Sequence, residues 1–137
     1  MLKILIADDH AIVRKGLREI LREASETTTV GEASNGQEAL DRARAEAWDM
    51  VVLDITMPDQ NGLAVLKALK REKPDLPVVI LSVHADYHYV VGSLRAGASG
   101  YLSKETAPEE LVLAVETVLA GGRYVSRSLA EKLKIDV

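Results

Sequence analysis

The chemistry-bearing residues of this sequence stand directly after short apolar runs. Asp8 and Asp9 follow residues 4–7, and Asp54 follows residues 50–53. Fully apolar runs of this length are typical of buried strands in a parallel sheet, and such sheets place their ligand sites at the carboxyl ends of the strands. Three carboxylates at one edge repel one another unless a cation lies among them. The three aspartates therefore predict a site for a hard divalent metal.

A lysine completes this set at the end of another strand-like region. Lys104 lies three residues beyond Tyr101, and its ammonium would offset charge on a phosphoryl group during transfer. An ionised aspartate such as Asp54 can act as a nucleophile toward phosphorus. Taken singly, each residue has a plainer interpretation: an acidic pair at a helix N-terminus, a loop carboxylate or a surface lysine. Their joint occurrence at the ends of different strands favours one phosphoryl-binding site.

Strand-like and helix-like runs alternate along the chain. The expected strands are residues 2–7, 27–33, 50–54, 78–82 and 98–102. Helical spacing of apolar residues predicts helices over residues 11–23, 37–45, 62–71, 86–96 and 108–120. Five strands that alternate with five helices indicate parallel pairing through right-handed crossovers, in a single doubly wound α/β domain.

Composition narrows the class of protein. The chain has 137 residues, a formal net charge of −4 and no cysteine. A domain of this length can bury a sizeable core, and its negative charge argues against electrostatic nucleic-acid binding by the domain itself. The lack of cysteine excludes disulfides, thiolate metal sites and thiol catalysis. Apolar runs are too short to span a bilayer and no secretory signal is evident, so we expect a cytoplasmic protein without a membrane partner.

An ordered set of motifs over roughly residues 2–120 resembles the receiver domain of two-component response regulators. The set comprises Asp8-Asp9, the run Leu53-Asp54-Ile55-Thr56-Met57-Pro58 with Gly62, then Ser82, and the run Gly100-Tyr101-Leu102-Ser103-Lys104. Residues 107–111 and 121–126 further resemble the NarL/FixJ subfamily, whose members usually carry a C-terminal helix-turn-helix domain. The resemblance implies a flavodoxin-like (βα)5 fold with a five-stranded parallel sheet of order 2-1-3-4-5. It also implies a receiver domain at residues 1–122 and a linker toward an output domain at residues 123–137.

The resemblance assigns chemical roles to the residues that would contact a phosphoryl group. Asp54 would be the phosphoacceptor, and Lys104 and the hydroxyl of Ser82 would contact the transferred group. The backbone amides of Thr56 and Val83 would complete its surroundings. Mg²⁺, or Mn²⁺ in its place, is the implied cofactor, and oxygen ligands suit both ions. The implied metal ligands are Asp8, Asp9, Asp54 and the backbone carbonyl of Thr56, while His10 is expected at the rim of the site.

Further residues would control the switch and the lifetime of the phosphorylated state. Ser82 and Tyr101 resemble a switch pair, in which the ring turns inward when the hydroxyl is drawn to the phosphate. Thr56 and His84 stand two residues beyond Asp54 and Ser82, where they would influence how water reaches the acyl phosphate.

The implied function is that of a phosphorylation-controlled switch. The protein would accept a phosphoryl group from a sensor histidine kinase and control an output, chiefly transcription through a DNA-binding domain absent from these residues. Homodimer formation stays open, since the helix over residues 108–120 is apolar on more than one face. Such a switch catalyses its own phosphorylation and dephosphorylation, so its classification as an enzyme also stays open.

Three alternatives remain on the sequence alone. Only residues 123–137 follow Gly122, too few for a helix-turn-helix domain, so one alternative is a stand-alone receiver that acts through protein contacts. Another is a haloacid-dehalogenase-like phosphotransferase, although such enzymes require a second aspartate at the position of Thr56. The last is an interaction module that never carries phosphate, against which the intact acidic set argues.

Overall fold

Parallel strands and the helices between them make up the described part of the chain. A computed structural model describes residues 2–83 and 86–134. Its strands are β1 (Lys3–Ala7), β2 (Thr29–Ala33), β3 (Met50–Asp54), β4 (Val78–Ser82), β5 (Gly100–Ser103) and β6 (Tyr124–Val125). Its helices are α1 (Ala11–Ala24), α2 (Gly36–Ala45), α3 (Gly62–Glu72), α4 (Tyr87–Arg95), α5 (Ala107–Leu119) and α6 (Arg127–Leu133).

The predicted topology is confirmed for the first five strands and is wrong in the number of strands. The sheet has the order β2-β1-β3-β4-β5-β6, which contains the expected order 2-1-3-4-5 and adds one strand at its edge. β6 pairs in parallel with β5, Gly100 with Tyr124 and Tyr101 with Val125. Two residues are too few to show a period-two alternation, so the sequence indicates only a linker in this tail.

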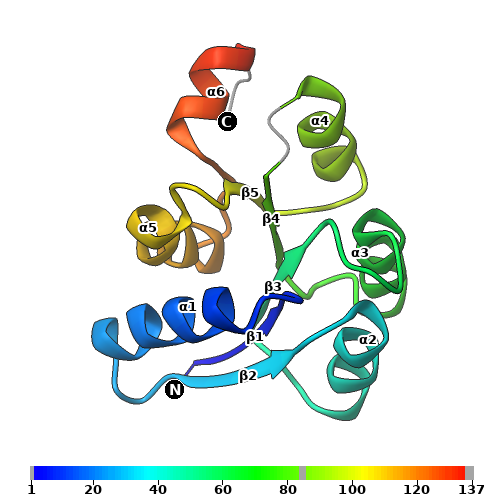
Figure 1. Cartoon of the computed structure of the whole chain (residues 1–137), viewed down its shortest axis with the longest axis vertical. Coiled ribbons are helices and arrows are strands. Elements are labelled where there is room, and N and C mark those ends of the chain that lie inside the picture. The colour runs from blue at the N-terminus through cyan, green and yellow to red at the C-terminus, as the bar shows by residue number, and fades with distance from the viewer. Residues whose placement is uncertain (1, 84–85, 135–137) are drawn as a thin grey trace.

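Helices cover both faces of the sheet (Figure 1). On one face Ile4 packs in a cluster that includes Leu111 of α5, and on the other Leu5 packs in a cluster that includes Leu66 of α3. Neighbouring strand residues point to opposite faces, and Ile4 and Leu5 are both fully buried. This double burial explains why the strands are apolar throughout. None of the described helices has both the length and the apolar character that a membrane crossing would need.

The strand register brings the chemistry-bearing residues to one edge of the sheet. Asp54 pairs with Leu81, and Ser82 pairs with Ser103. The backbone amide of Lys104 donates to the carbonyl of Ser82 at 2.9 Å. Because all these strands run in parallel, the residues that end them lie on the same side of the sheet.

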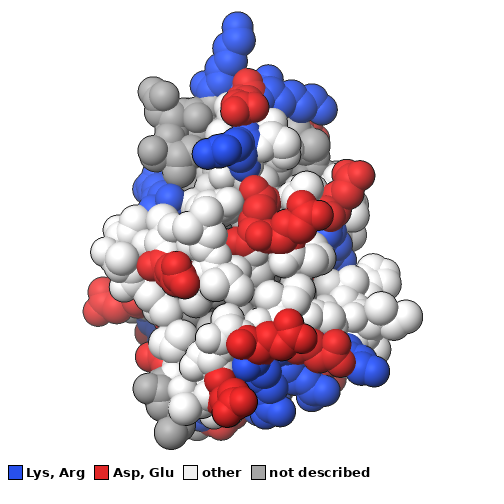
Figure 2. Space-filling view, turned by 90° about the vertical axis from the view of Figure 1, so that its left-hand side faces the viewer, with Lys and Arg blue, Asp and Glu red and all other residues white. Residues whose placement is uncertain are grey.

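On the face that carries α1 and α5, uncharged side chains lie between groups of acidic ones (Figure 2). Ile12 of α1 is 86% exposed, and Leu113 and Leu119 of α5 are 56% and 38% exposed. The apolar pattern on more than one side of the helix over residues 108–120 therefore corresponds to exposed side chains. Exposed apolar side chains on two helices that contact each other can contribute to a contact surface.

Glu110 of α5 holds the C-terminal segment against the rest of the domain. Its carboxylate accepts hydrogen bonds from Ser126 Oγ at 2.6 Å, Thr106 Oγ1 at 2.8 Å and the Tyr124 hydroxyl at 3.1 Å. Ser126 Oγ in turn accepts from the backbone amide of Ser103 at 3.0 Å. Ser126 stands at the N-cap of α6, but its side chain makes no capping hydrogen bond, because its hydroxyl donates to Glu110.

We expect Glu110→Ala to lower the free energy of unfolding by about 1–3 kcal/mol at neutral pH, because several polar groups lose a charged acceptor. Burial alone would raise the pKa of Glu110, but the hydrogen bonds from Ser126 and Thr106 outweigh it and hold the pKa below its ordinary value. A depressed carboxyl pKa stabilises the fold above the unfolded-state pKa of about 4.3, and this stabilisation is lost as the pH falls through the lower folded-state value. Thermal unfolding from pH 7 downward should therefore show the difference between wild type and variant shrinking below about pH 4.

The matched control for this change is Glu109→Ala. Glu109 is the preceding residue on α5 and is exposed, so its removal should change unfolding little at any pH. A difference between wild type and Glu110→Ala that stays constant with pH would contradict the assignment of the stabilisation to the ionised carboxylate.

Candidate functional site

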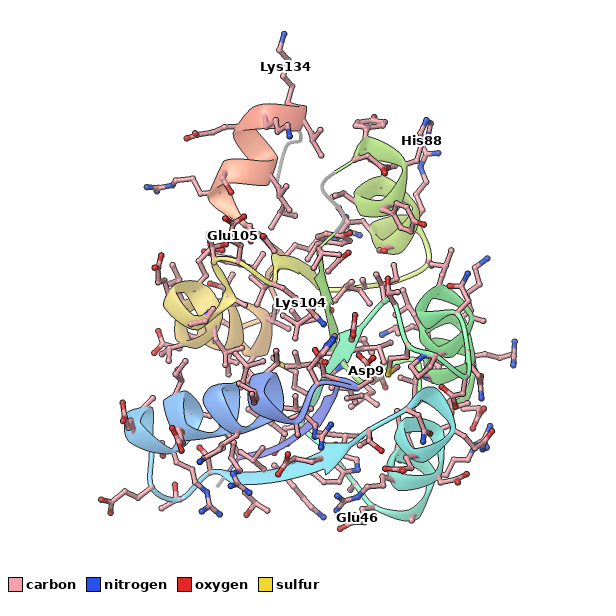
Figure 3. All side chains as sticks on the ribbon, viewed as in Figure 1. Asp9, Glu46, His88, Lys104, Glu105 and Lys134 are labelled. Atoms are coloured by element: carbon pink, nitrogen blue, oxygen red, sulfur yellow. The ribbon has the colours of Figure 1, made fainter. Side chains whose placement is uncertain are left out.

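Three carboxylates, an imidazole and a lysine meet at the carboxyl edge of the sheet. Oxygens of Asp8, Asp9 and Asp54 and a ring nitrogen of His10 all lie within 4.8 Å of one another. Lys104 Nζ lies 2.9 Å from Asp8 Oδ2 and 3.0 Å from Asp54 Oδ2. Asp8 and Asp54 are 0% and 1% exposed, and Asp9 and Lys104 are seen near each other at the centre of Figure 3. The structure thus brings together residues that are far apart in the sequence.

Local backbone contacts fix the two buried aspartates. The amide of Asp8 donates to the carbonyl of Ala33 at 3.0 Å, and Arg14 Nη1 donates to the carbonyl of Asp8 at 2.6 Å. Asp54 is the last residue of β3, and its Oδ1 accepts from the amide of Thr56 at 3.0 Å. The Thr56 amide, expected from the sequence to contact a phosphoryl group, here binds the carboxylate of Asp54 itself.

The buried charges influence one another's ionisation. Burial raises the pKa of Asp54 above its ordinary value and the charge of Asp8 adds to this, while the Thr56 amide and Lys104 oppose the shift only in part. Burial alone would lower the pKa of Lys104, but its ion pairs with Asp8 and Asp54 outweigh this effect and leave the pKa raised. Lys104 therefore remains a cation, and three carboxylates still face one lysine. A divalent cation fits this excess of oxygen donors and negative charge.

The residues expected to act as a switch lie next to each other. Ser82 ends β4 and Tyr101 lies in β5, and both are buried. Burial raises the pKa of Tyr101 to about 12, against a smaller opposing effect of its hydrogen bond with Ser82. The ring therefore lies inside the domain in this structure. Val83 is 72% exposed directly after Ser82, and His84, expected to tune the lifetime, lies outside the described residues.

The sequence does not predict the observed contacts of Asp59 and His10. Asp59 accepts hydrogen bonds from the backbone amides of Gly36 at 2.8 Å and Gln37 at 3.0 Å, which ties the loop after β3 to the N-terminus of α2. The sequence predicts His10 only at the rim, yet its Nδ1 lies 3.1 Å from Asp8 Oδ1. Adjacency to the acidic pair is a signal for His10, whereas nothing in the local sequence connects Asp59 with a helix more than twenty residues earlier.

Gly62 lets the loop after Asp54 close tightly. A Cβ at Gly62 would lie 2.3 Å from Ile55 Cα and 2.4 Å from the Ile55 carbonyl oxygen. The amide of Gly62 also donates to that carbonyl at 2.9 Å. The start of α3 is therefore pressed against the backbone that follows the Asp54 carboxylate.

We expect Gly62→Ala to destabilise the fold by about 1–3 kcal/mol, because the added methyl group must displace backbone and not a flexible side chain. Urea unfolding measures this change. The matched control is Gly16→Ala in α1, where a Cβ would meet nothing within 4 Å, and where alanine should stabilise the helix by about 0.5–1 kcal/mol. Equal stabilities of the two variants would show that the contact with Ile55 relaxes freely.

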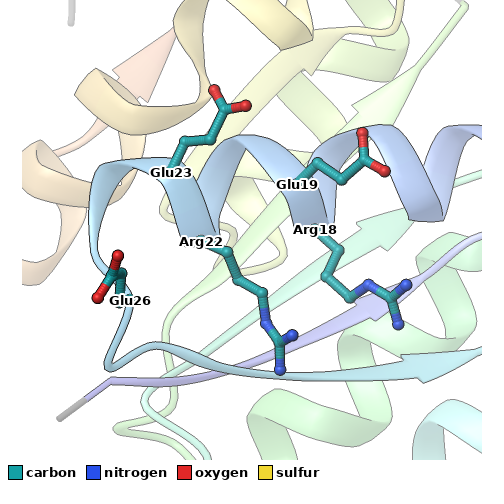
Figure 4. A pocket seen from close by; sticks show the side chains of 5 residues that line it. All are labelled: Arg18, Glu19, Arg22, Glu23 and Glu26. Carbon is teal, nitrogen blue, oxygen red and sulfur yellow. The ribbon is translucent and has the colours of Figure 1, made fainter.

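One surface hollow lies away from this chemistry. It has a volume of about 520 Å³ and is lined by Arg18, Glu19, Arg22, Glu23 and Glu26. Figure 4 shows the two arginines pointing to one side of α1 while Glu19 and Glu23 point to the other. Arg18 is already paired with Glu32 at 3.0 Å. This surface, with two arginines and three glutamates, shares no residue with the acidic cluster, so the hollow does not mark the position of the chemistry.

Comparison with known proteins relates this chain to one family. The family model of the response regulator receiver domain matches residues 4–116 of the chain. The response regulator UvrY of Escherichia coli is 37% identical over 135 residues, which cover 98% of this chain and 62% of that protein. The response regulator GacA of Pseudomonas aeruginosa is 36% identical over 98% of this chain and 63% of that protein. The chain thus spans a little over three fifths of the curated relatives it matches.

Solved structures show the same likeness. A LuxR-family two-component response regulator from Aurantimonas sp. SI85-9A1 has a TM-score of 0.88 and 33% identity, and the match covers 98% of both chains. The isolated REC domain of RcsB from Salmonella enterica serovar Typhimurium, solved with the phosphomimetic BeF3-, has a TM-score of 0.87 and 25% identity. That match covers 95% of this chain and 96% of the other.

Proposed function

This chain belongs to the response regulator receiver domain family, and from that membership we propose that Asp54 accepts a phosphoryl group from a sensor histidine kinase in a Mg²⁺-dependent reaction. The observation that carries the proposal is the convergence of Asp8, Asp9 and Asp54 within 4.8 Å, with Lys104 Nζ 3.0 Å from Asp54 Oδ2. Single residues of these types are common at strand ends, but this joint arrangement is suited to phosphoryl transfer.

The proposed transfer uses Asp54 as the nucleophile. A carboxylate oxygen of Asp54 forms a bond to phosphorus while the P–N bond to the donor histidine breaks and its electron pair leaves with the imidazole. The ammonium of Lys104 offsets negative charge on the transferred group. Ser82 donates its hydroxyl to a phosphoryl oxygen, and the amides of Thr56 and Val83 donate to the others. In this scheme the Thr56 amide exchanges its bond with Asp54 Oδ1 for one with the phosphoryl group.

Asp8, Asp9, Asp54 and the carbonyl of Thr56 would hold the metal ion. Bound Mg²⁺ would supply charge neutralisation for both the carboxylates and the incoming phosphoryl group. The fit is supported by the excess of carboxylates over lysine, and by the raised pKa of Asp54, which burial causes first and Asp8 second. We include Mn²⁺ as an alternative ion because carboxylate, carbonyl and water ligands suit it as well.

Phosphorylation would act through the contact between Ser82 and Tyr101. When the Ser82 hydroxyl turns to the phosphate, its hydrogen bond with Tyr101 is lost. The phosphorylated and unphosphorylated states would therefore differ in how they stabilise the buried Tyr101 ring. Thr56 and His84 would set how fast water attacks the acyl phosphate. We propose that the protein is primarily a signalling switch, which catalyses its own phosphorylation and dephosphorylation.

The output would be transcriptional. One structural relative, the RcsB response regulator of Salmonella typhimurium, is described as showing conformational dynamism for DNA interaction, and the match covers 67% of that longer chain. We propose that residues 1–122 form the receiver, that residues 123–137 lead toward a C-terminal DNA-binding domain, and that the protein acts in the cytoplasm. The exposed apolar side chains of α1 and α5 support a homodimer as a further partner.

Acetyl phosphate, a small phosphodonor, tests the proposed function. Intact-mass measurement after incubation with Mg²⁺ should show one added phosphoryl group, and the gain should be absent when Mg²⁺ is omitted. Rapid multiple turnover of phosphomonoesters would instead support a haloacid-dehalogenase-like enzyme. No modification in the presence of Mg²⁺ would overturn the proposal and favour an interaction module.

A further inference from the structure

His10 places an imidazole beside the three carboxylates and the lysine of the site. Its Nδ1 lies 3.1 Å from Asp8 Oδ1 and 3.2 Å from Asp9 Oδ1. We infer that His10 is a metal ligand for divalent ions that favour nitrogen, such as Co²⁺, Ni²⁺ and Zn²⁺, and that it sets the metal selectivity of the site. The inference rests on the proposed function, since it takes the same carboxylates that would hold Mg²⁺.

The spacing of the ligand atoms suits a single ion. Metal–ligand bonds of about 2.1 Å place neighbouring ligand atoms of an octahedral ion about 3 Å apart. The distances from His10 Nδ1 to the two carboxylate oxygens, 3.1 Å and 3.2 Å, are close to that value. The Asp54 carboxylate belongs to the same group of atoms within 4.8 Å. No large movement is needed to bring one nitrogen and three carboxylates around a common centre.

His10 Nδ1 has two polar neighbours that require opposite roles of it. The nitrogen lies 3.3 Å from Lys104 Nζ, which can only donate, and 3.1 Å from Asp8 Oδ1, which can only accept. One ring nitrogen cannot serve both partners at once. Within the described part of the chain, the buried Asp8 Oδ2 also accepts no directed hydrogen bond, although Lys104 Nζ lies 2.9 Å away as an ion pair. A metal ion would bind the nitrogen lone pair and the carboxylate oxygens together.

The backbone holds His10 in place while its ring remains accessible. His10 is the N-cap residue of α1, and its amide donates to Asp8 Oδ1 at 2.7 Å. Its side chain is 63% exposed, so the ring can adjust its orientation without disturbing packed neighbours. The position is fixed by the same turn that presents Asp8 and Asp9.

The imidazole should affect the binding of some divalent ions more than that of others. Mg²⁺ prefers oxygen ligands and retains water, so its binding should depend on the carboxylates and hardly on His10. Imidazole suits Co²⁺, Ni²⁺ and Zn²⁺, whose affinity for a nitrogen-containing site exceeds that of ions earlier in the series. The pocket would therefore take Mg²⁺ through oxygen alone and these ions through oxygen and His10, in competition with Mg²⁺.

The experiment compares Co²⁺ and Mg²⁺ binding in wild type and His10→Ala. Co²⁺ is followed by its visible absorption, which responds to nitrogen ligation, and Mg²⁺ by calorimetry. Loss of one ligand should weaken Co²⁺ binding at least about tenfold, whereas Mg²⁺ binding should change by less than about twofold. The visible spectrum of bound Co²⁺ should change at the same time. Added Mg²⁺ should displace Co²⁺ from wild type.

Two control variants make the outcome decisive. His88→Ala removes an exposed histidine of α4, far from Asp9 in Figure 3, so it should leave Co²⁺ binding unchanged. Asp9→Ala should weaken the binding of both Co²⁺ and Mg²⁺. Three results would overturn the inference: unchanged Co²⁺ affinity in His10→Ala, equal losses of Co²⁺ and Mg²⁺ affinity in that variant, or weaker Co²⁺ binding in His88→Ala. Absence of Mg²⁺ binding in wild type would instead overturn the proposed function.

Discussion

An Asp54→Asn variant is expected to fold, to unfold at a higher temperature than wild type, and to gain no phosphoryl group from acetyl phosphate. Asparagine has nearly the same shape as aspartate but offers no carboxylate nucleophile. Burial and the charge of Asp8 raise the pKa of Asp54, so its ionised form costs stability in the folded protein. A raised carboxyl pKa stabilises the fold at low pH, and that stability is lost as pH rises through the unfolded-state value toward the folded-state value. At neutral pH the amide should therefore relieve a repulsion.

The comparison that isolates Asp54 uses Asp59, an aspartate of the loop that follows β3. Asp59 caps α2 through hydrogen bonds from Gly36 and Gln37, so Asp59→Asn should lose stability while its phosphorylation site stays intact. Thermal unfolding and intact mass would be measured on both variants, with and without Mg²⁺. A mass gain in Asp54→Asn would place the nucleophile elsewhere, and a lower unfolding temperature would mean that the pairing with Lys104 outweighs the cost of burial.

Strand ends are the part of the site that the sequence predicts well. Each central strand is buried on both faces, so its apolar run stops where the backbone leaves the sheet, and Asp8, Asp54 and Ser82 mark those points. Parallel pairing then requires that residues at these points share one edge. The convergence of distant segments follows from periodicity and topology, without knowledge of any side-chain contact.

Contacts that depend on side-chain direction could not be predicted in the same way. The sequence places Glu110 only in the first turn of a helix, but its carboxylate is a common acceptor for Thr106, Tyr124 and Ser126. The strand β6 exists because these contacts position two residues beside β5, and a two-residue strand has no pattern of its own. The proximity of His10 Nδ1 to Asp8 depends on a rotamer, which sequence spacing does not determine.

Lys104→Ala is expected to lower the free energy of unfolding by about 3–5 kcal/mol in the absence of metal, because it leaves buried carboxylates without their cation. The ammonium lies 2.9 Å from Asp8 Oδ2 and 3.0 Å from Asp54 Oδ2, and the lysine side chain is only 13% exposed. A metal ion in the pocket would take over part of this compensation. At a Mg²⁺ concentration roughly 100 times the dissociation constant, binding to the folded state alone would restore about 2.7 kcal/mol.

Metal affinity and phosphorylation should respond differently to this change. Lys104 repels a metal cation but contacts no metal in the proposed site, so Lys104→Ala should keep or gain Mg²⁺ affinity, while Asp9→Ala should lose it. The phosphorylation-dependent response, followed by tyrosine fluorescence with acetyl phosphate or beryllofluoride, should weaken strongly in Lys104→Ala, because charge on the phosphoryl group then lacks its lysine. Lys67→Ala, at an exposed lysine of α3, is the matched control and should behave as wild type. Equal loss of Mg²⁺ affinity in Lys104→Ala and Asp9→Ala would contradict this division, because it would mean that the lysine organises the metal site and not the phosphoryl group.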